Sequence, residues 1–268
     1  MGMVPEMVIF DYGQTLADEG DYDAVRGNRA VLSMAVKNPR GITAEQLQEF
    51  ADELTGDMEG LFGEEKRGKA EGEFSAVSFD RYLYEYLEIE LGIPWEEVER
   101  VFWNGAARVR VTENVEKLLD YLYREGIGTA VVSNMMKSTR SLKEKIDGLL
   151  PGNHFSFVMT SCDYLFRKPH PRIFAMAQVK AGIPADRIWY CGDNLFCDVK
   201  GAAGAGMKAV WYAPYAKKGQ EAPDGVDYLT VNSWDELIPA SNEPKPSWLG
   251  LGDCREGQIP RCSAALQV

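Results

Sequence analysis

The chain has 268 residues, 45% hydrophobic and 26% charged, which predicts a soluble globular protein of one large or two ordinary domains. A formal net charge of -12 argues against nucleic-acid binding, because that affinity rests on cationic contacts to phosphates. No apolar run approaches the roughly 18 residues that a membrane span requires, so we expect no membrane association. The first residues lack a secretory signal, and five scattered cysteines without a CxxC pair indicate reduced thiols; both features predict a cytoplasmic protein.

The first element in chain order is the stretch VIFDYGQTLA, residues 8–17. Three apolar residues lead directly into Asp11, which predicts a buried strand that ends on a carboxylate.

Residues 18–107 have the period of helices, and no strand is expected between them. Thr43 and Gln46 form a capping box, and Pro94 suits a first helical turn. The glycine- and charge-rich residues 56–73 predict a loop, within which GEEKRGKA at 63–70 nearly matches a P-loop. It ends on alanine and follows no apolar strand, so we interpret it as a solvated linker. The aromatic stripe Phe79, Tyr82 and Tyr86 is expected in the core of this helical module.

From about Thr112 the chain alternates between short β-branched runs and amphipathic helices. Thr112 is placed to cap the helix that follows it, and Gly126 fits the position just past its end. Such alternation predicts a parallel sheet with right-handed crossovers. We therefore predict an α/β fold, a Rossmann-like three-layer core with an inserted all-helical cap. The predicted boundaries are 1–17 and 108–240 for the core, 18–107 for the cap and 241–268 for an irregular extension.

Chemically capable side chains follow the predicted strands. Ligands of open parallel sheets bind at the carboxyl ends of the strands. Asp11 ends the first strand, Ser133 and Asn134 end the second, and Asp193 ends the run RIWYCGD. Lys168 precedes a proline-started helix in RKPHP. We expect these groups to meet at one rim.

This ordered set resembles the haloacid dehalogenase-like hydrolase superfamily, most of whose members are magnesium-dependent phosphatases. VIFDYGQTL is similar to its first motif, VVSN to the second, Lys168 to the third and GDNLFCDVKGAAGAGM to the fourth. The helical insert also lies where the family has its cap. The resemblance covers roughly residues 7–238.

The resemblance implies Asp11 as the nucleophile on a phosphoryl group, Lys168 as its counter-charge and Thr15 as a support of the following loop. Ser133, Asn134 and Lys168 would hold the phosphoryl group of a small phosphorylated metabolite. The implied cofactor is Mg²⁺, with Asp11, the Gly13 carbonyl, Asp193 and Asp198 as its ligands, Asp198 directly or through water. Neither the identity of the substrate nor the oligomeric state follows from these motifs.

Gly13 departs from the family pattern. Family phosphatases usually carry a second aspartate at this position, which protonates the leaving oxygen and then activates water. Slow turnover is therefore expected unless another group substitutes. Two alternatives stay open: a metal-independent 2-haloacid dehalogenase, which the Asp193 and Asp198 pair disfavours, and a weak or non-enzymatic phosphate- or partner-binding protein.

The remaining motifs have simpler interpretations. GAAGAG at 201–206 is expected to serve close packing, and Cys191 and Cys197 to be small buried hydrophobes. His154 and His170 are too few for a zinc site.

Overall fold

The centre of the fold is a six-stranded parallel sheet with the strand order β10-β9-β8-β1-β6-β7. It is seen in a computed structural model that describes residues 4–62, 72–216 and 224–238. Its strands are β1 (Met7–Phe10), β6 (Gly128–Ser133), β7 (Phe155–Thr160), β8 (Ile188–Gly192), β9 (Lys208–Tyr212) and β10 (Tyr228–Val231). The predicted Rossmann-like α/β core is confirmed.

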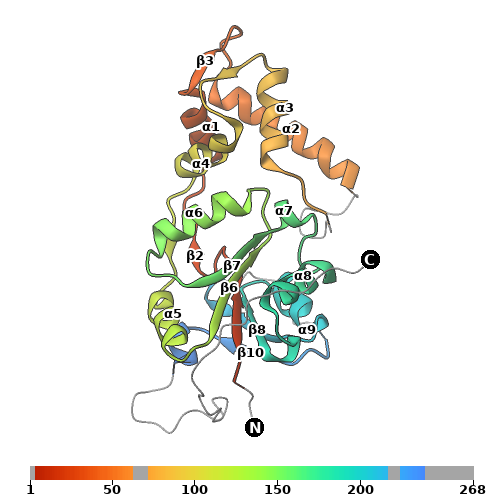
Figure 1. The fold of residues 1–268 in the computed structure, drawn as a ribbon. Helices are drawn as coiled ribbons and strands as arrows, with labels where there is room; N and C mark the ends of the chain where they lie inside the picture. Colours follow the sequence, from red (N-terminus) through yellow and green to blue (C-terminus); the bar gives the residue numbers. More distant parts are fainter. Residues whose placement is uncertain (1–3, 63–71, 217–223, 239–268) are drawn as a thin grey trace, which may run out of the picture. The chain divides into compact units, whose positions relative to one another are not determined.

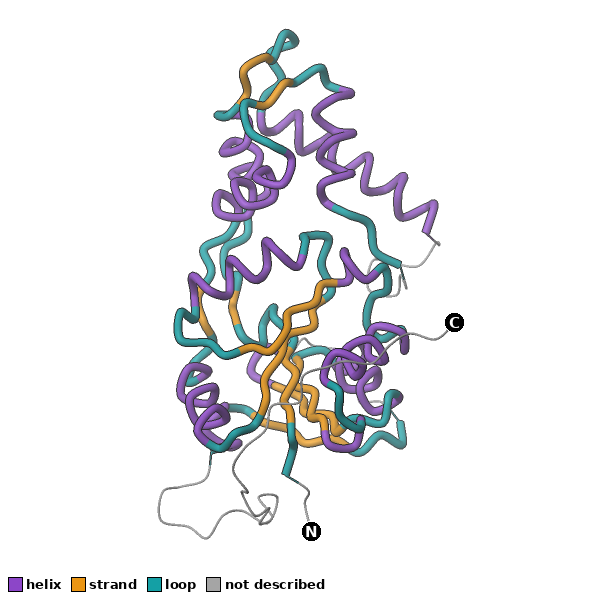
Figure 2. The backbone as a smooth tube through the Cα atoms, viewed as in Figure 1, coloured by secondary structure: helices purple, strands orange, loops and turns teal. Residues whose placement is uncertain are grey.

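Helices flank both faces of this sheet, as Figures 1 and 2 show. They are α5 (Val115–Arg124), α6 (Thr139–Leu149), α7 (Ser161–Tyr164), α8 (Pro171–Ala181) and α9 (Gly201–Gly204). Short helical turns are η1 (Ala185–Arg187), η2 (Leu195–Lys200), η3 (Ala213–Tyr215) and η4 (Trp234–Leu237). The burial of the strands on both faces explains their apolar, β-branched sequences.

Alternate residues of β1 face the two sides of the sheet. Ile9 belongs to a buried cluster with Ile173 and Phe174 of α8. Phe10 instead packs edge-to-face on Trp234 of η4, with ring centroids 5.7 Å apart. This alternation fixes the direction of each β1 side chain, so the backbone leaves the sheet at Asp11 in a defined orientation.

The described part of the insert contains four helices, in agreement with its helical period: α1 (Ala24–Leu32), α2 (Ala44–Phe62), α3 (Ala76–Tyr86) and α4 (Trp95–Ala106). The capping box at the start of α2 is confirmed, since the Gln46 backbone N–H donates to Thr43 Oγ1 and the Thr43 backbone N–H donates to Gln46 Oε1. Pro94 occupies the N-cap position of α4.

Two expectations about the insert were wrong. Two short strands, β3 (Ala35–Lys37) and β4 (Glu90–Leu91), pair antiparallel within it, and β2 (Ala17–Asp18) pairs with β5 (Arg110–Val111) where the chain enters and leaves it. Residues 56–62, expected as part of a loop, belong instead to α2, which continues to Phe62.

The aromatic stripe also differs from expectation. Tyr82 and Tyr86 are 51% and 58% exposed, and their rings stack on each other at 5.7 Å. Only Phe79 is partly buried against the core of the insert.

Thr112 does not cap α5. Asn114 occupies that N-cap position, and the Thr112 hydroxyl instead donates to the carbonyl of Thr15 at 2.7 Å. Gly126 has the predicted left-handed conformation after the helix, with φ at 70°.

Pro5–Ile238 form one compact unit. The boundaries predicted between core and cap, and the extension at 241–268, stay predictions. The linker interpretation of 63–70 and that extension concern residues outside the described ranges. Among the described helices, none has the length and apolar character that crossing a bilayer demands.

Candidate active site

Asp11 stands at the carboxyl end of the central strand. Phe10 is in register with Val131 of β6 and Cys191 of β8, and the Asp11 N–H donates to the Cys191 carbonyl at 2.8 Å. The chain passes from β1 to β6 and β7 on one side and then crosses to β8 on the other side of β1, so the strand order reverses here, which is where open sheets bind ligands. The side chain is partly exposed.

The segment after Asp11 is a tight turn. The carbonyl of Tyr12 accepts hydrogen bonds from the backbone N–H groups of Thr15, Leu16 and Ala17. Thr15 is fully buried, and its hydroxyl has no hydrogen-bond partner among the described residues. Its carbonyl, however, accepts from the Thr112 hydroxyl, so Thr15 supports the turn through its backbone.

Lys168 connects two of the three predicted acids. Its ammonium nitrogen lies 2.8 Å from Asp11 Oδ1 and 2.6 Å from Asp198 Oδ1. The contact with Asp11 is an ion pair whose geometry does not meet that of a hydrogen bond. The contact with Asp198 is both an ion pair and a hydrogen bond. Lys168 is only 2% exposed, so these charges interact with little screening by water.

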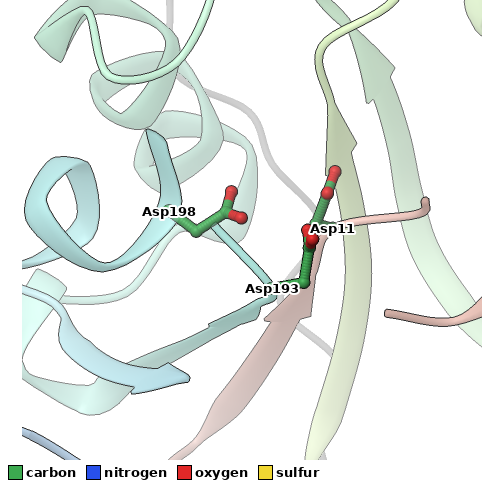
Figure 3. Close-up of side chains that lie close together, drawn as sticks. All are labelled: Asp11, Asp193 and Asp198. Atoms are coloured by element: carbon green, nitrogen blue, oxygen red, sulfur yellow. The ribbon is translucent and has the colours of Figure 1, made fainter. Parts of the chain in front are cut away.

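Asp193 and Asp198 complete an acidic cluster with Asp11. One carboxylate oxygen from each lies within 4.8 Å of the others, and Figure 3 shows the three side chains meeting at the ends of two strands and one helical turn. Asp193 follows β8, and Asp198 lies on η2, a π-helical turn that carries its carboxylate back toward the strand.

A glycine makes room for Asp198. A Cβ at Gly192 would lie 2.3 Å from the Asp198 carboxylate, far inside contact distance. Asp198 Oδ2 also accepts from the Asn194 N–H at 3.0 Å. The carboxylate therefore occupies space that any other residue at 192 would fill.

Burial sets the electrostatics of this cluster. Burial raises the pKa of Asp198 to about 6, although Lys168 opposes the shift. Burial alone would lower the pKa of Lys168, but the Asp11 and Asp198 carboxylates outweigh it and raise that pKa well above its ordinary value. Attraction between this buried cation and the two acids offsets part of the desolvation cost of all three groups.

Ser133 and Asn134 follow β6 as expected. Ser133 is 3% exposed. The Asn134 amide donates to the Lys168 carbonyl at 2.9 Å, and its oxygen accepts from the Lys168 N–H at 2.7 Å. The Asn134 side chain thus binds the backbone of the loop that carries Lys168. Its contact with a substrate stays a prediction.

Gly13 lies in open space, with no heavy atom within 4 Å of an added Cβ. The neighbouring acids are engaged elsewhere. Glu19 accepts from Trp103 Nε1 at 2.8 Å, and Asp18 accepts from the Gly20 N–H at 2.8 Å.

Tyr190 was missed by sequence reasoning. Lys168 Nζ donates to its hydroxyl at 2.9 Å, and that hydroxyl donates to the Val132 carbonyl at 2.7 Å. The only signal in the sequence is a tyrosine inside an otherwise apolar strand, where a buried hydroxyl needs a partner.

Glu73 was missed as well. This buried carboxylate accepts from the Ser161 hydroxyl at 2.7 Å and pairs with Arg167, the neighbour of Lys168. It lies at the end of the segment 56–73, which was predicted as a loop, so no sequence pattern distinguished it.

Of the other motifs, GAAGAG packs closely as expected, since a Cβ at Gly201 would lie 2.6 Å from the Phe174 ring. Cys191 is fully buried; Cys197 is partly exposed, and burial raises the pKa of its thiol to about 11.

The donor set fits a divalent cation. Three converging carboxylates carry more negative charge than Lys168 neutralises, and oxygen atoms are the ligands that Mg²⁺ prefers.

Comparison with known proteins places the chain among relatives of this architecture. The family model described as haloacid dehalogenase-like hydrolase matches residues 8–212. A phosphoserine phosphatase of Thermus thermophilus is 32% identical over 134 residues, 49% of this chain and 53% of the relative. A glyceraldehyde 3-phosphate phosphatase of Pyrococcus furiosus is 30% identical over 154 residues, 55% of this chain and 62% of the relative.

The chain thus spans between half and two thirds of the length of these curated relatives. The solved structure of a 2-haloacid dehalogenase from Pseudomonas syringae shares the fold, with a TM-score of 0.60, 24% identity, and coverage of 88% of this chain and 96% of that one. The matched family model spans all four motifs that meet around Asp11, and the chain belongs to the haloacid dehalogenase-like hydrolase family.

Proposed function

We propose that the protein is a Mg²⁺-dependent phosphatase that hydrolyses a small phosphate monoester through an aspartyl phosphate at Asp11. The observation that carries this proposal is the contact of one buried ammonium, Lys168, with Asp11 and Asp198 beside Asp193. The phosphatase names of the two curated relatives support it.

In the first step, a carboxylate oxygen of Asp11 attacks phosphorus, the bond to the ester oxygen breaks, and the leaving alkoxide takes its proton from water. Lys168 offsets the negative charge that builds up between Asp11 and the phosphoryl oxygens. In the second step, water attacks the phosphorus of the aspartyl phosphate, which releases inorganic phosphate and restores the carboxylate.

Asp11, Asp193 and Asp198, with the Gly13 carbonyl, are the groups we assign to a Mg²⁺ ion. Such an ion supplies positive charge at the phosphoryl oxygens. Two hydrogen bonds keep Lys168 in place: Asn134 accepts from its backbone N–H, and the Tyr190 hydroxyl accepts from its ammonium group.

Gly13 leaves both steps without the usual proton donor and base. General acid–base help is worth roughly 10²–10⁴-fold, so loss of it slows the reaction most where the leaving group is poor and where water must attack. An aryl phosphate, whose leaving group needs no proton, is therefore the substrate of choice for detecting activity.

The test uses p-nitrophenyl phosphate with and without Mg²⁺, for the wild type and Asp11→Asn. We expect Mg²⁺-dependent release of p-nitrophenol that Asp11→Asn abolishes; a stoichiometric burst followed by a slow phase would locate the defect in the second step. Full activity of Asp11→Asn would overturn the proposal. Release of chloride from a 2-haloacid in the presence of chelator would replace it with dehalogenation.

A further inference from the structure

Glu73 closes a ring of contacts that runs through the backbone of the candidate active site. This residue of the insert precedes α3, and its side chain is only 3% exposed. Its carboxylate accepts a hydrogen bond from the Ser161 hydroxyl at 2.7 Å and pairs with the guanidinium group of Arg167. A carboxylate removed from water needs such partners, because an unpaired buried charge is costly.

Both partners of this carboxylate lead to Lys168. Arg167 directly precedes the lysine in the chain. The Ser161 hydroxyl oxygen also accepts from the Met135 N–H at 2.9 Å, and Met135 directly follows Asn134. The Asn134 side chain in turn makes two hydrogen bonds to the backbone of Lys168. The contacts therefore form a closed ring that includes the backbone of the lysine.

The backbone that carries Glu73 is bound to the same loop. The Glu73 N–H donates to the Leu165 carbonyl at 2.9 Å, and Gly72 forms an isolated antiparallel bridge with Phe166. These backbone contacts fix the place from which the carboxylate reaches Arg167.

The two adjacent cations of this loop contact different acids. Lys168 contacts Asp11 and Asp198, whereas Arg167 contacts Glu73. The Arg167 side chain is 18% exposed, so water screens its charge only in part. Without Glu73, the guanidinium group would keep its charge and lose this partner, and we expect the loop to shift as a result. A displacement of about 1 Å at a reacting centre can cost roughly 100-fold in rate.

We propose that Glu73 is a positioning residue for the transfer of the phosphoryl group. Acting through Arg167 and Ser161, it sets the position of the Lys168 ammonium group relative to the acids of the site. The inference rests on the proposed function and adds a residue of the insert on which the rate depends. Because Lys168 offsets charge that builds up during the attack on phosphorus, its displacement should lower kcat more than it raises KM.

The first test compares Glu73→Gln with the wild type, using p-nitrophenyl phosphate and saturating Mg²⁺. Glutamine keeps the size and can still accept from Ser161, but it no longer neutralises Arg167. We expect kcat to fall by about 10- to 100-fold, with KM changed by less than about threefold. Glu99→Gln is the matched control and should keep kcat within about threefold of the wild type. Glu99 is also a buried acid of the insert that accepts from two serine hydroxyls.

A second variant, Glu73→Gln with Arg167→Met, covers the case in which Glu73→Gln alone fails to fold. It leaves no buried charge unpaired at this place, which favours folding. Its kcat should match that of Glu73→Gln, or of Arg167→Met, within about threefold, because all these changes break one contact. Wild-type kcat in the double variant would overturn the inference.

The ammonium group of Lys168 provides a readout that needs no turnover. Its N–H signal in NMR spectra, assigned by its loss in Lys168→Met, should be sharp in the wild type and in Glu99→Gln, because the group is buried and paired. The signal should shift or broaden in Glu73→Gln. Absence of turnover in the wild type would overturn the proposed function, and the NMR comparison would then decide the inference by itself. Wild-type kcat or an unchanged signal in Glu73→Gln, or an equal loss of kcat in Glu99→Gln, would each overturn the inference.

Discussion

The Tyr190 hydroxyl accepts a hydrogen bond from Lys168 Nζ at 2.9 Å and donates its own to the buried carbonyl of Val132 at 2.7 Å. This chain ties the ammonium group of the lysine to the backbone of the neighbouring strand. The lysine therefore has a fixed position before any ligand binds, which favours the charge-compensating role proposed for it.

Tyr190→Phe should weaken both the fold and the site. The substitution leaves the Val132 carbonyl without its donor, which costs about 1–3 kcal/mol of unfolding free energy in urea titrations. Loss of the anchor on Lys168 should lower kcat/KM for p-nitrophenyl phosphate by about 10- to 100-fold. Tyr121→Phe is the matched control, because the Tyr121 hydroxyl is buried without a partner among the described residues. If both variants behave alike, the Tyr190 hydroxyl has no special role.

Gly192→Ala should disrupt the acidic cluster. Its Cβ would occupy the space of the Asp198 carboxylate, so we expect a loss of about 1–3 kcal/mol in stability and a weaker affinity for Mg²⁺. Gly148→Ala on α6 has open space around its Cβ and should stabilise the protein by about 0.5–1 kcal/mol. Unchanged Mg²⁺ affinity in Gly192→Ala, by calorimetry, would contradict the assigned role of Asp198.

Gly13→Asp should raise turnover of alkyl phosphates. The new side chain enters open space, and it supplies a proton donor and base worth roughly 10²-fold or more. Gly13→Asn matches it in size without the proton. The measurement is kcat for 2-hydroxyethyl phosphate, and an equal gain in both variants would show that the proton is not what limits the rate.

Mg²⁺ should stabilise the folded protein. Binding relieves repulsion among Asp11, Asp193 and Asp198, and at about 100 times its Kd it adds ~2.7 kcal/mol. The midpoint of thermal unfolding should therefore rise with Mg²⁺ and fall back with chelator. Asp193→Asn should lose this response, whereas the exposed Asp186→Asn should retain it. A full response in Asp193→Asn would remove Asp193 from the set of ligands.

Asp80→Asn should stabilise the protein only above mildly acidic pH. The folded carboxyl group holds its proton up to a pKa of about 7, whereas the unfolded group releases it near 3.9. The wild type therefore loses stability between about pH 4 and pH 7, and a neutral Asn avoids that loss. We expect equal stability at pH 4 and a variant about 4 kcal/mol more stable at pH 8, by urea titration. The same difference at both pH values would exclude ionisation as the cause.

Much of the molecule follows from sequence patterns because their causes are local. The alternation of β-branched runs with amphipathic helices after Thr112 predicts the parallel sheet, and parallel strands bring Asp11, Ser133 and Asp193 to one edge. The capping box at Thr43 and Gln46 was predictable for the same reason, since both partners lie within one turn.

The details that only the tertiary structure decided join residues far apart in the chain. The helical period did not reveal that Tyr82 and Tyr86 face solvent. The period shows that a helix has an aromatic face, but it does not show whether another element packs against that face. Nor did it reveal Glu73 beside Arg167, or Asp80 at the wall of a cavity.

The sequence by itself determined the fold family and the chain order of the candidate site residues Asp11, Ser133, Lys168 and Asp193. Tertiary structure decided that Lys168 bridges Asp11 and Asp198 next to the Tyr190 hydroxyl, and that Asp52, Asp80 and Glu99 line one cavity beside the helical insert. The physical reason is that burial and charge compensation depend on which distant side chains pack together, and neither is encoded in the spacing of any one segment.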